Sequence, residues 1–399
     1  MSASGFLRAR VGTTGTFGLA GAVSALGTVR LPALSDKLAL DAASLGFALL
    51  VLGIGALAAT QGARILLGRF GSRRVLMLAC PVASALSAAS GIVDTYPLLL
   101  AAFLAFGLMF GLLDSSMNAQ AATLERVAGR HLMNGAHAGW SVGAVFGGAM
   151  GALTARIGLG YTETVIGGAA VAFPIAVLLA TTYIPDAPAA SGERGRGRIP
   201  PVLYLVGVVA FASFVVEGSV SNWSSLYLRD ELHAKEHLAA LGYPSLELAM
   251  LLGRTVGDRI RTRIGSRTML TVSGLIGVVG LGLVVGAPSW PVAASGFFVV
   301  GLAVSTVVPL AFSIAGALEP SGAGVAQVAA MGYGGMLLGP VVLGLIANAS
   351  SLRVTFAVVA GLAVATSVIG RTLPDGHVTS AGSTGNGKST LARAGRPDR

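Results

Sequence analysis

Two acidic residues lie inside long apolar runs, and they are the first candidates for chemistry. Asp114 lies in the run GLLDSSMN and Glu217 lies in FVVEGSVSN. An ionisable side chain at the centre of a bilayer costs about 2.5–3.5 kcal/mol on insertion scales, so such residues are concentrated on ion and substrate pathways. A buried carboxyl group can bind or release a proton when its access to water changes. We therefore predict that Asp114 and Glu217 are proton-coupling residues.

Polar side chains accompany both acids. Asn118 follows Asp114 by four residues, which places the two on one helix face, and Ser221 stands in the same relation to Glu217. A carboxylate with amide, hydroxyl and aromatic neighbours suits a small polar or amphipathic ligand. The predicted substrate-binding residues are Asn118, His137, Trp140, Ser221, Asn222 and Trp223.

Each of these groups also has a purely structural interpretation. Asp114 and Asn118 could do no more than pin two helices together. His137 begins its apolar run and could face cytoplasmic water. Trp223 could mark the membrane boundary, where tryptophan is enriched.

The composition indicates which elements must position these residues. Of the 399 residues, 54% are apolar and only 11% are charged, with a mean hydropathy of +0.78. A soluble domain carries about 25% charged residues, so a soluble fold, and with it a soluble enzyme, is excluded. Strands of an outer-membrane barrel alternate over about 10 residues, and the runs here are about twice that long. The chain is therefore expected to be an all-α membrane protein with helices of roughly 20 residues. The single cysteine, Cys80, lies inside an apolar run and forms no disulfide framework.

Twelve transmembrane helices are predicted, and the basic residues orient them. Six Lys and Arg residues fall in odd-numbered loops, and the other 21, among which we count Arg254, fall in even-numbered loops and the two tails. Positive charge collects on the cytoplasmic side, so both termini should be cytoplasmic. The net charge of +10 is thus explained by orientation rather than by nucleic-acid binding. The predicted spans are 11–30, 43–64, 75–92, 97–121, 134–157, 162–183, 201–226, 238–256, 268–287, 291–315, 325–347 and 352–372.

The chain is predicted to consist of two related halves. A polar linker, 186–200, separates a six-helix bundle at 1–185 from a second at 201–372, and a disordered cytoplasmic tail follows at 373–399. The segment Arg69–Arg73 recurs as Arg263–Arg267, and the same offset of 194 residues relates further short matches. Because six spans separate the copies, they share one orientation, as in transporters built from parallel repeats.

The duplication and the span limits constrain what the acids can do. At 1.5 Å per residue, Asp114 and Glu217 differ in depth by on the order of 10 Å, so we do not expect them to share a proton. The counterpart of Asp114 in the second half is Val308. The role of Asp114 should therefore belong to one half only.

Small residues recur along one predicted span. Glycines follow one another at four-residue spacing at positions 135, 139, 143, 147 and 151. That register lets helices approach closely, and we expect a tight helix–helix contact there.

A signature follows the second predicted span. It runs Gly68-Arg69-Phe70-Gly71-Ser72-Arg73-Arg74, and a second copy begins Gly257-Asp258-Arg259. With the six-plus-six plan and the basic central linker, it resembles the G-x-x-x-D-R-x-G-R-R loop of the major facilitator superfamily. Segments 106–125, 134–148 and 217–224 are similar to a bacterial branch of poorly characterised inner-membrane members. Gly68 stands where the family has Asp, which leaves the usual loop-to-helix ion pair of the first half without its acid.

The resemblance implies a fold of two six-helix pseudo-repeats and transport by alternating access. It also implies that Arg69, Arg73, Asp258 and Arg259 are cytoplasmic gate residues, although solvated charges that only orient the protein would have the same types. We expect a monomeric secondary transporter of the bacterial inner membrane that moves a small molecule with protons and needs no cofactor. Export of an amphipathic compound and uptake of a sugar-like solute both remain open.

Two other classes of protein, a nucleotide-binding membrane protein and a membrane sensor, are alternatives. The tail segment 382–389 matches the phosphate-binding pattern G-x-x-x-x-G-K-[ST], but that pattern works between a strand and a helix, and no apolar strand precedes it. A membrane sensor that binds a ligand without moving it is the other alternative.

Overall fold

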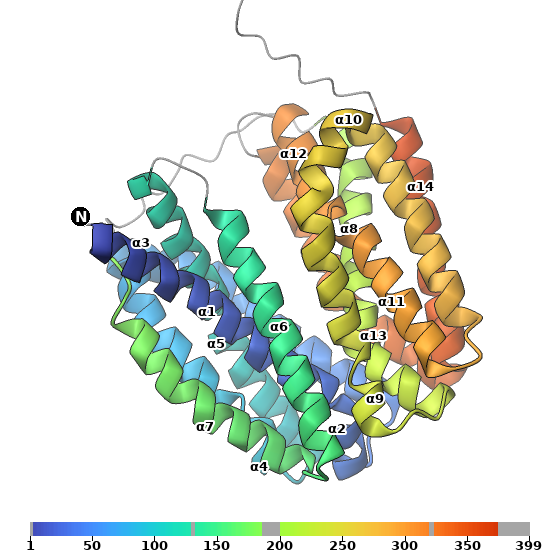
Figure 1. Cartoon of the computed structure of the whole chain (residues 1–399), viewed down its shortest axis with the longest axis horizontal. Helices are drawn as coiled ribbons and strands as arrows, with labels where there is room; N and C mark the ends of the chain where they lie inside the picture. The colour runs from blue at the N-terminus through green and yellow to red at the C-terminus, as the bar shows by residue number, and fades with distance from the viewer. Residues whose placement is uncertain (1–2, 129–131, 186–199, 319–322, 374–399) are drawn as a thin grey trace, which may run out of the picture.

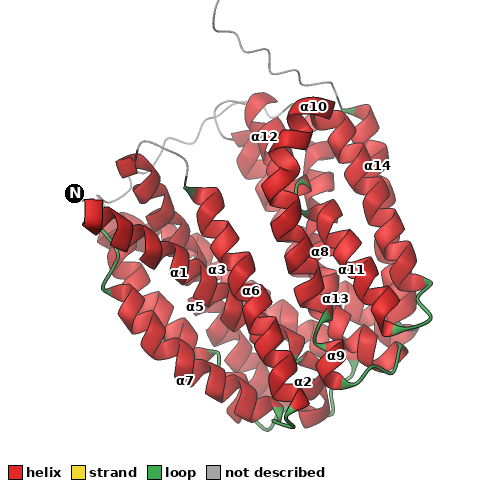
Figure 2. Ribbon diagram, in the orientation of Figure 1, coloured by secondary structure: helices red, strands yellow, loops and turns green. Residues whose placement is uncertain are grey.

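The computed structural model describes residues 3–128, 132–185, 200–318 and 323–373, and all of its regular structure in these ranges is helical (Figure 2). The tail motif at 382–389 and nearly all of the predicted linker lie outside the described residues. The elements are α1 (Ala3–Val29), α2 (Leu31–Leu38), α3 (Ala42–Leu86), α4 (Ala89–Ile92), α5 (Tyr96–Ala128), α6 (Met133–Arg156), α7 (Tyr161–Ala180), α8 (Val202–Leu226), the π-helical turn η1 (Tyr227–Glu231), α9 (Glu236–Ala239), α10 (Gly242–Val285), α11 (Trp290–Val304), α12 (Val307–Leu318), α13 (Ala323–Ala349) and α14 (Leu352–Thr372).

The helices occupy the positions of the twelve predicted spans. Nine helical segments in the described ranges are long and apolar enough to cross a bilayer, and the pair α1–α2, bent by 48°, makes a tenth. The other two predicted spans, 134–157 and 238–256, coincide with α6 and with the first part of α10. These two segments are less apolar because α6 is rich in glycine and α10 carries Glu247 and Arg254. The chain is an all-α membrane protein.

The helices form two bundles (Figure 1). We call α1–α7 the N-terminal half and α8–α14 the C-terminal half. The halves meet through α3 and α13 and through α6 with α9 and α10. They come together at the end that carries α2, α4 and α9, which we call the joined end. Their ribbons diverge toward the opposite end, the diverging end, where α10 bends (Figure 1).

Two glycines bend the long helices, and their geometry repeats between the halves. Gly71 in α3 has φ 76° and ψ 159°, and Gly265 in α10 has φ 79° and ψ 163°. A positive φ is costly for residues with a Cβ, so glycine lets each chain reverse with little loss of helix. The structure corrects the expected loop between 64 and 75, because the chain stays helical there except at Gly71.

The same offset of 194 residues also relates helix contacts. A Cβ at Gly107 would lie 2.1 Å from the carbonyl oxygen of Leu52, and a Cβ at Gly301 would lie 2.4 Å from that of Leu246. Each residue of the second pair follows its counterpart by 194 positions, so the repeated glycine lets equivalent helices touch. The contact confirms the internal duplication.

The glycine series of α6 packs against α1, as expected for four of its five members. A Cβ at Gly143 would lie 1.8 Å from the carbonyl oxygen of Gly18, and one at Gly147 would lie 2.1 Å from that of Ala22. Gly139 faces the backbone and side chain of Thr14 in α1 and Gly151 faces the Val29 side chain, whereas a Cβ at Gly135 would meet no heavy atom within 4 Å. The two backbones are therefore in direct contact along most of α6.

Other boundaries differ from expectation for local reasons. The predicted span 291–315 breaks into α11 and α12 around Ser305. Predicted span 238–256 starts later, at Gly242, because η1 and the short α9 occupy the preceding residues. Asp41 caps α3, and hydrogen bonds from the Ser44 hydroxyl and backbone N–H lower the pKa of that exposed carboxyl group.

Candidate functional site

Asp114 lies half-buried in the middle of α5, on the side that faces the C-terminal half. Its carboxyl group accepts a hydrogen bond of 3.3 Å from the Asn118 side chain, which also donates to the Asp114 carbonyl at 2.9 Å. In the described residues Asp114 forms no ion pair with a basic side chain. It is thus a membrane-embedded acid held by an amide, which leaves it open to a proton or a ligand.

A group of aromatic rings begins one helical turn from this acid. Phe110 lies one helical turn before Asp114, and its ring stands 6.0 Å from that of Trp140, edge to face. The ring of His137 stands 5.0 Å from that of Phe17. From the C-terminal half, Tyr333 of α13 lies within electrostatic range of Asp114, yet its side chain is 42% exposed. Tyr333 is therefore an exposed side chain of the C-terminal half that lies near Asp114 of the N-terminal half.

Glu217 lies in the middle of α8, beside α10 of the same half. It is half-buried, and its carboxyl group lies within electrostatic range of Arg254 and Glu247 of α10. The predicted neighbours of Glu217 hydrogen-bond within their own helix. The Ser221 hydroxyl donates to the Glu217 carbonyl at 2.8 Å, and Asn222 donates to the Gly218 carbonyl at 2.9 Å.

Trp223 is buried between helices, unlike Ser221 and Asn222. Its side chain is fully buried, and its indole N–H has no hydrogen-bond partner in the described residues. The ring packs against Gly344 of α13, next to the crossing of α13 with Ala42 of α3. In this state Trp223 fills the contact between helices instead of facing open space.

A group of residues around Arg254 is missing from the sequence-based candidates. Arg254 lies in the first third of α10 and donates a hydrogen bond of 3.3 Å to the Ser141 hydroxyl of α6, across the two halves. Glu247, about two turns earlier and only 3% exposed, accepts a hydrogen bond of 2.9 Å from Tyr243. The basic-loop pattern assigns Arg254 to orientation, but the structure places it in the first part of α10, within predicted span 238–256 and against α6. Its position within predicted span 238–256 is the signal that identifies it.

The predicted gate residues lie at the diverging end. Arg69 and Arg259 are exposed, and the Arg69 guanidinium stacks 5.4 Å from the centre of the adjacent Phe70 ring. Arg73 is half-buried. The side chain of Asp258 lies outside the described residues. Neither Arg69 nor Arg259 has a described hydrogen bond or ion pair to the other half, as expected where the halves are apart.

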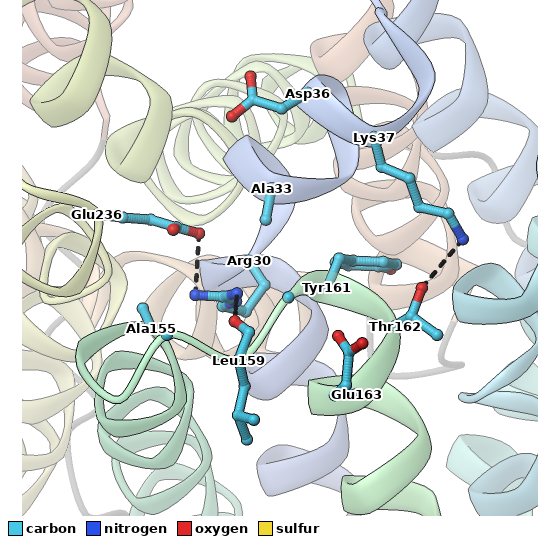
Figure 3. Close-up of a pocket in the computed structure, with 12 residues that line it drawn as sticks. Arg30, Ala33, Asp36, Lys37, Ala155, Leu159, Tyr161, Thr162, Glu163 and Glu236 are labelled. Atoms are coloured by element: carbon cyan, nitrogen blue, oxygen red, sulfur yellow. Dashed lines mark hydrogen bonds and ion pairs between the residues drawn. The ribbon is translucent and has the colours of Figure 1, made fainter.

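Two ion pairs close the joined end. Arg30, between α1 and α2, is 1% exposed and lies 2.9 Å from Glu236 of α9 (Figure 3). Asp36 of α2 lies 2.8 Å from Arg229 of η1. Both pairs join the N-terminal half to the C-terminal half. From the sequence, Arg30 and Arg229 count only among the six basic residues of the odd-numbered loops, and Asp36 and Glu236 are not singled out.

A pocket of about 420 Å³ adjoins the Arg30–Glu236 pair. Arg30 also donates to the Leu159 carbonyl at 2.5 Å, and Lys37 donates to the Thr162 hydroxyl at 3.1 Å (Figure 3). The hydrogen bonds of Arg30 and Lys37 hold the segment between α6 and α7 beside α9. The polar contacts of this pocket thus support the ion pair by which Arg30 joins the two halves.

We expect Glu236→Gln to open the joined end. Removing one partner of an ion pair leaves the buried Arg30 charge uncompensated, which destabilises the closed arrangement. A loss of about 1–2 kcal/mol would raise the open population about 5- to 30-fold. The measurement is the labelling rate of an Ala33→Cys reporter in the pocket by a membrane-impermeant maleimide.

The control for this experiment is Lys235→Gln, which removes an exposed neighbouring charge that has no described partner. A double variant, Arg30→Glu with Glu236→Arg, exchanges the two charges and keeps the ion pair. Slow labelling in this double variant would show that the faster labelling of Glu236→Gln results from loss of the pair. Equal labelling in Glu236→Gln and the parent would contradict a closing role.

Comparisons with known proteins agree with this architecture. The model of the Major Facilitator Superfamily matches residues 12–316 and 205–394. An uncharacterized transporter of Sinorhizobium fredii is 36% identical over 348 residues, covering 85% of this chain and 91% of the relative. An uncharacterized MFS-type transporter of Yersinia pestis is 33% identical over 357 residues, covering 88% and 92%. The membrane protein MosC of Rhizobium meliloti is 29% identical over 362 residues, covering 88% and 86%.

Solved structures share the fold at low sequence identity. The nucleoside transporter NupG matches with a TM-score of 0.70 and 16% identity, covering 92% of this chain and 98% of its own. The E. coli fucose:proton symporter FucP matches with a TM-score of 0.62 and 14% identity, covering 92% and 98%. These matches agree with the two bundles and the repeated glycine bends. The family model and the two relatives above 30% identity show that the chain belongs to the Major Facilitator Superfamily and is a multi-pass membrane transporter.

Proposed function

We propose that the chain is a proton-coupled secondary transporter that moves a small amphipathic molecule across the bacterial inner membrane by alternating access. The observation that carries the proposal is Asp114, an acid within the membrane that has an amide partner and no described ion pair and lies one helical turn from the Phe110–Trp140 ring contact. Such an acid can exchange a proton when the space between the halves opens to one side and then to the other. The substrate is proposed to bind in that space, against Asp114, Trp140 and Tyr333.

We also propose which end of the molecule faces the cytoplasm. The predicted cytoplasmic loops lie at the diverging end, so the joined end with Arg30–Glu236 is the external face. The chain then rests in an inward-facing state. A bacterial homolog of the lysosomal transporter Spinster, solved in an inward-facing and occupied conformation, supports this assignment with a TM-score of 0.69 at 14% identity and 90% coverage of this chain.

The aromatic rings favour an amphipathic ligand, because rings bury flat apolar surface while Asp114 and Asn118 satisfy a polar group. Export of such a compound is the proposed direction. A sugar-like solute, the other expectation from the sequence, would instead be accumulated with protons. A thermal-shift screen of purified protein with sugars, nucleosides and amphipathic amines distinguishes the two classes.

We expect Glu217→Gln to bind one proton fewer than the parent protein. A glutamine keeps the shape and the hydrogen bonds of the side chain but cannot titrate. The measurement is proton release on saturation with the compound found in the screen, followed by a pH indicator in weakly buffered detergent. Asp94→Asn, which alters an acid with 86% exposure, is the control and should match the parent. Unchanged proton release in Glu217→Gln would remove Glu217 from the proposal.

A further inference from the structure

Ser141 connects the two halves through a contact between α6 and α10. It belongs to α6, and its side chain is fully buried. Its hydroxyl accepts a hydrogen bond of 3.3 Å from Arg254 of α10. The same hydroxyl lies near the carboxyl group of Glu247, also on α10. One serine of the N-terminal half therefore meets a cation and an acid of the C-terminal half.

Glu247 has an incomplete set of partners. Tyr243 donates to Oε1 at 2.9 Å, whereas Oε2 is buried and has no hydrogen-bond partner in the described residues. Leaving an ionised oxygen without a donor in a buried site is costly, and more so than for a neutral group. Oε2 is thus the atom on which a proton would be held.

Four titratable groups surround the Arg254 guanidinium. They are His137 of α6, Glu217 of α8, and Tyr243 and Glu247 of α10. Neither glutamate is within ion-pair distance of Arg254 in the described residues. With both glutamates ionised, the two acids outnumber the one guanidinium. A proton on either acid balances the charge.

The proton on Glu247 would change the contact at Ser141. When Glu247 is ionised, the Ser141 hydroxyl can donate to the carboxylate while it accepts from Arg254, so it is held from both sides. When Glu247 is protonated, the hydrogen bond from Ser141 to its carboxyl group loses the assistance of the negative charge, and the hydroxyl is held less firmly beside Arg254. The link between the halves then weakens.

We propose that Glu247 is a further proton-binding residue and that it controls the contact between the halves through Ser141 and Arg254. The inference rests on the proposed proton-coupled transport, and it adds a residue that converts protonation into movement. In this scheme Ser141 and Arg254 are positioning residues. Glu247 gains its proton at Oε2 from the open side and releases it to the other side after the halves rearrange.

The test follows the separation of the halves as the pH changes. Spin labels are attached to the full-length chain in nanodiscs at Val127→Cys of α5 and Thr262→Cys of α10, both exposed and near the diverging end. Double electron–electron resonance gives the distance distribution at pH 5 and pH 8. The parent should shift between two populations. Glu247→Gln, which resembles the protonated acid, should show the pH 5 distribution at both pH values.

Three further variants distinguish loss of the contact at Ser141 from a general loss of structure. Ser141→Ala removes the cross-half contact and should also lose the pH response. Ser115→Ala removes a hydroxyl that bonds within α5, to the Gly111 carbonyl at 2.9 Å, and should keep the full response. Arg254→Lys should retain part of the response, because it keeps the charge but loses the guanidinium geometry.

A full pH response in Glu247→Gln or Ser141→Ala overturns the inference, and so does a parent without any response. Proton-driven transport by the parent in proteoliposomes is measured in parallel. If transport is proton-driven while Glu247→Gln responds normally, only the role of Glu247 fails. If the parent shows no proton-driven transport, the proposed function fails as well.

Discussion

The Asp114→Asn variant is expected to lose proton-driven transport while it still exchanges substrate across the membrane. A pH difference of one unit stores about 1.4 kcal/mol per proton, which supports about a tenfold concentration ratio of the transported compound. Without a titratable group at this position, the gradient no longer acts on the substrate, and the ratio should fall to one. The measurement is transport into proteoliposomes with an imposed pH gradient, using the compound found in the ligand screen.

Exchange without a gradient is the internal control for this variant. Asn118 can still bond the new amide, so the helix should fold and the space between the halves should keep its shape. Labelled substrate should therefore exchange at a rate close to that of the parent. An Asp114→Asn protein that still maintains the tenfold ratio would exclude Asp114 as a coupling residue.

The Gly143→Val variant is expected to have the largest effect on stability. The first added carbon alone would lie 1.8 Å from the carbonyl oxygen of Gly18 and 2.6 Å from its carbon, so α1 and α6 must separate. Overpacking a rigid contact commonly costs about 1–3 kcal/mol, and here the opposing atoms are backbone and cannot rotate away. We expect a lower melting temperature in detergent and a lower yield of monodisperse protein.

Gly135→Val is the matched control, because it lies in the same helix and the same four-residue series but has open space around its Cβ position. Both variants lose the same glycine flexibility and gain the same side chain. A difference between them isolates the contact with α1. Equal melting temperatures would show that the close approach of α1 and α6 contributes little to stability.

Much of the fold was predictable because the bilayer imposes a strong and local constraint. Each span must be apolar for about 20 residues, and this requirement can be seen without knowing which helices touch. The repeat offset predicted the likeness of the halves, and the structure extends it from Gly71 and Gly265 to the contacts of Gly107 and Gly301. The glycine series of α6 also predicted a packing face, although not that α1 is the partner.

The contacts between the halves were not predictable from the sequence. Asp36 and Arg229 are 193 residues apart, and nothing local to either one indicates the other. Arg254 was hidden for a different reason, since basic residues are expected in cytoplasmic loops and it lies only five residues before Arg259. Only one of the two neighbours of Asp114 could be predicted. Asn118 follows from helical spacing, whereas the position of Tyr333 depends on how the two bundles meet.

The most direct test of the central claim is the distance across both ends of the same molecule. Labels at Val127→Cys and Thr262→Cys report the diverging end, and labels at Ile157→Cys of the N-terminal half and Val354→Cys of α14 report the joined end. Alternating access coupled to protons predicts that a change from pH 8 to pH 5 moves the two distances in opposite directions. It also predicts that Asp114→Asn combined with Glu217→Gln abolishes both movements. Distances that change in the same direction, or that respond fully without the two acids, would contradict the account.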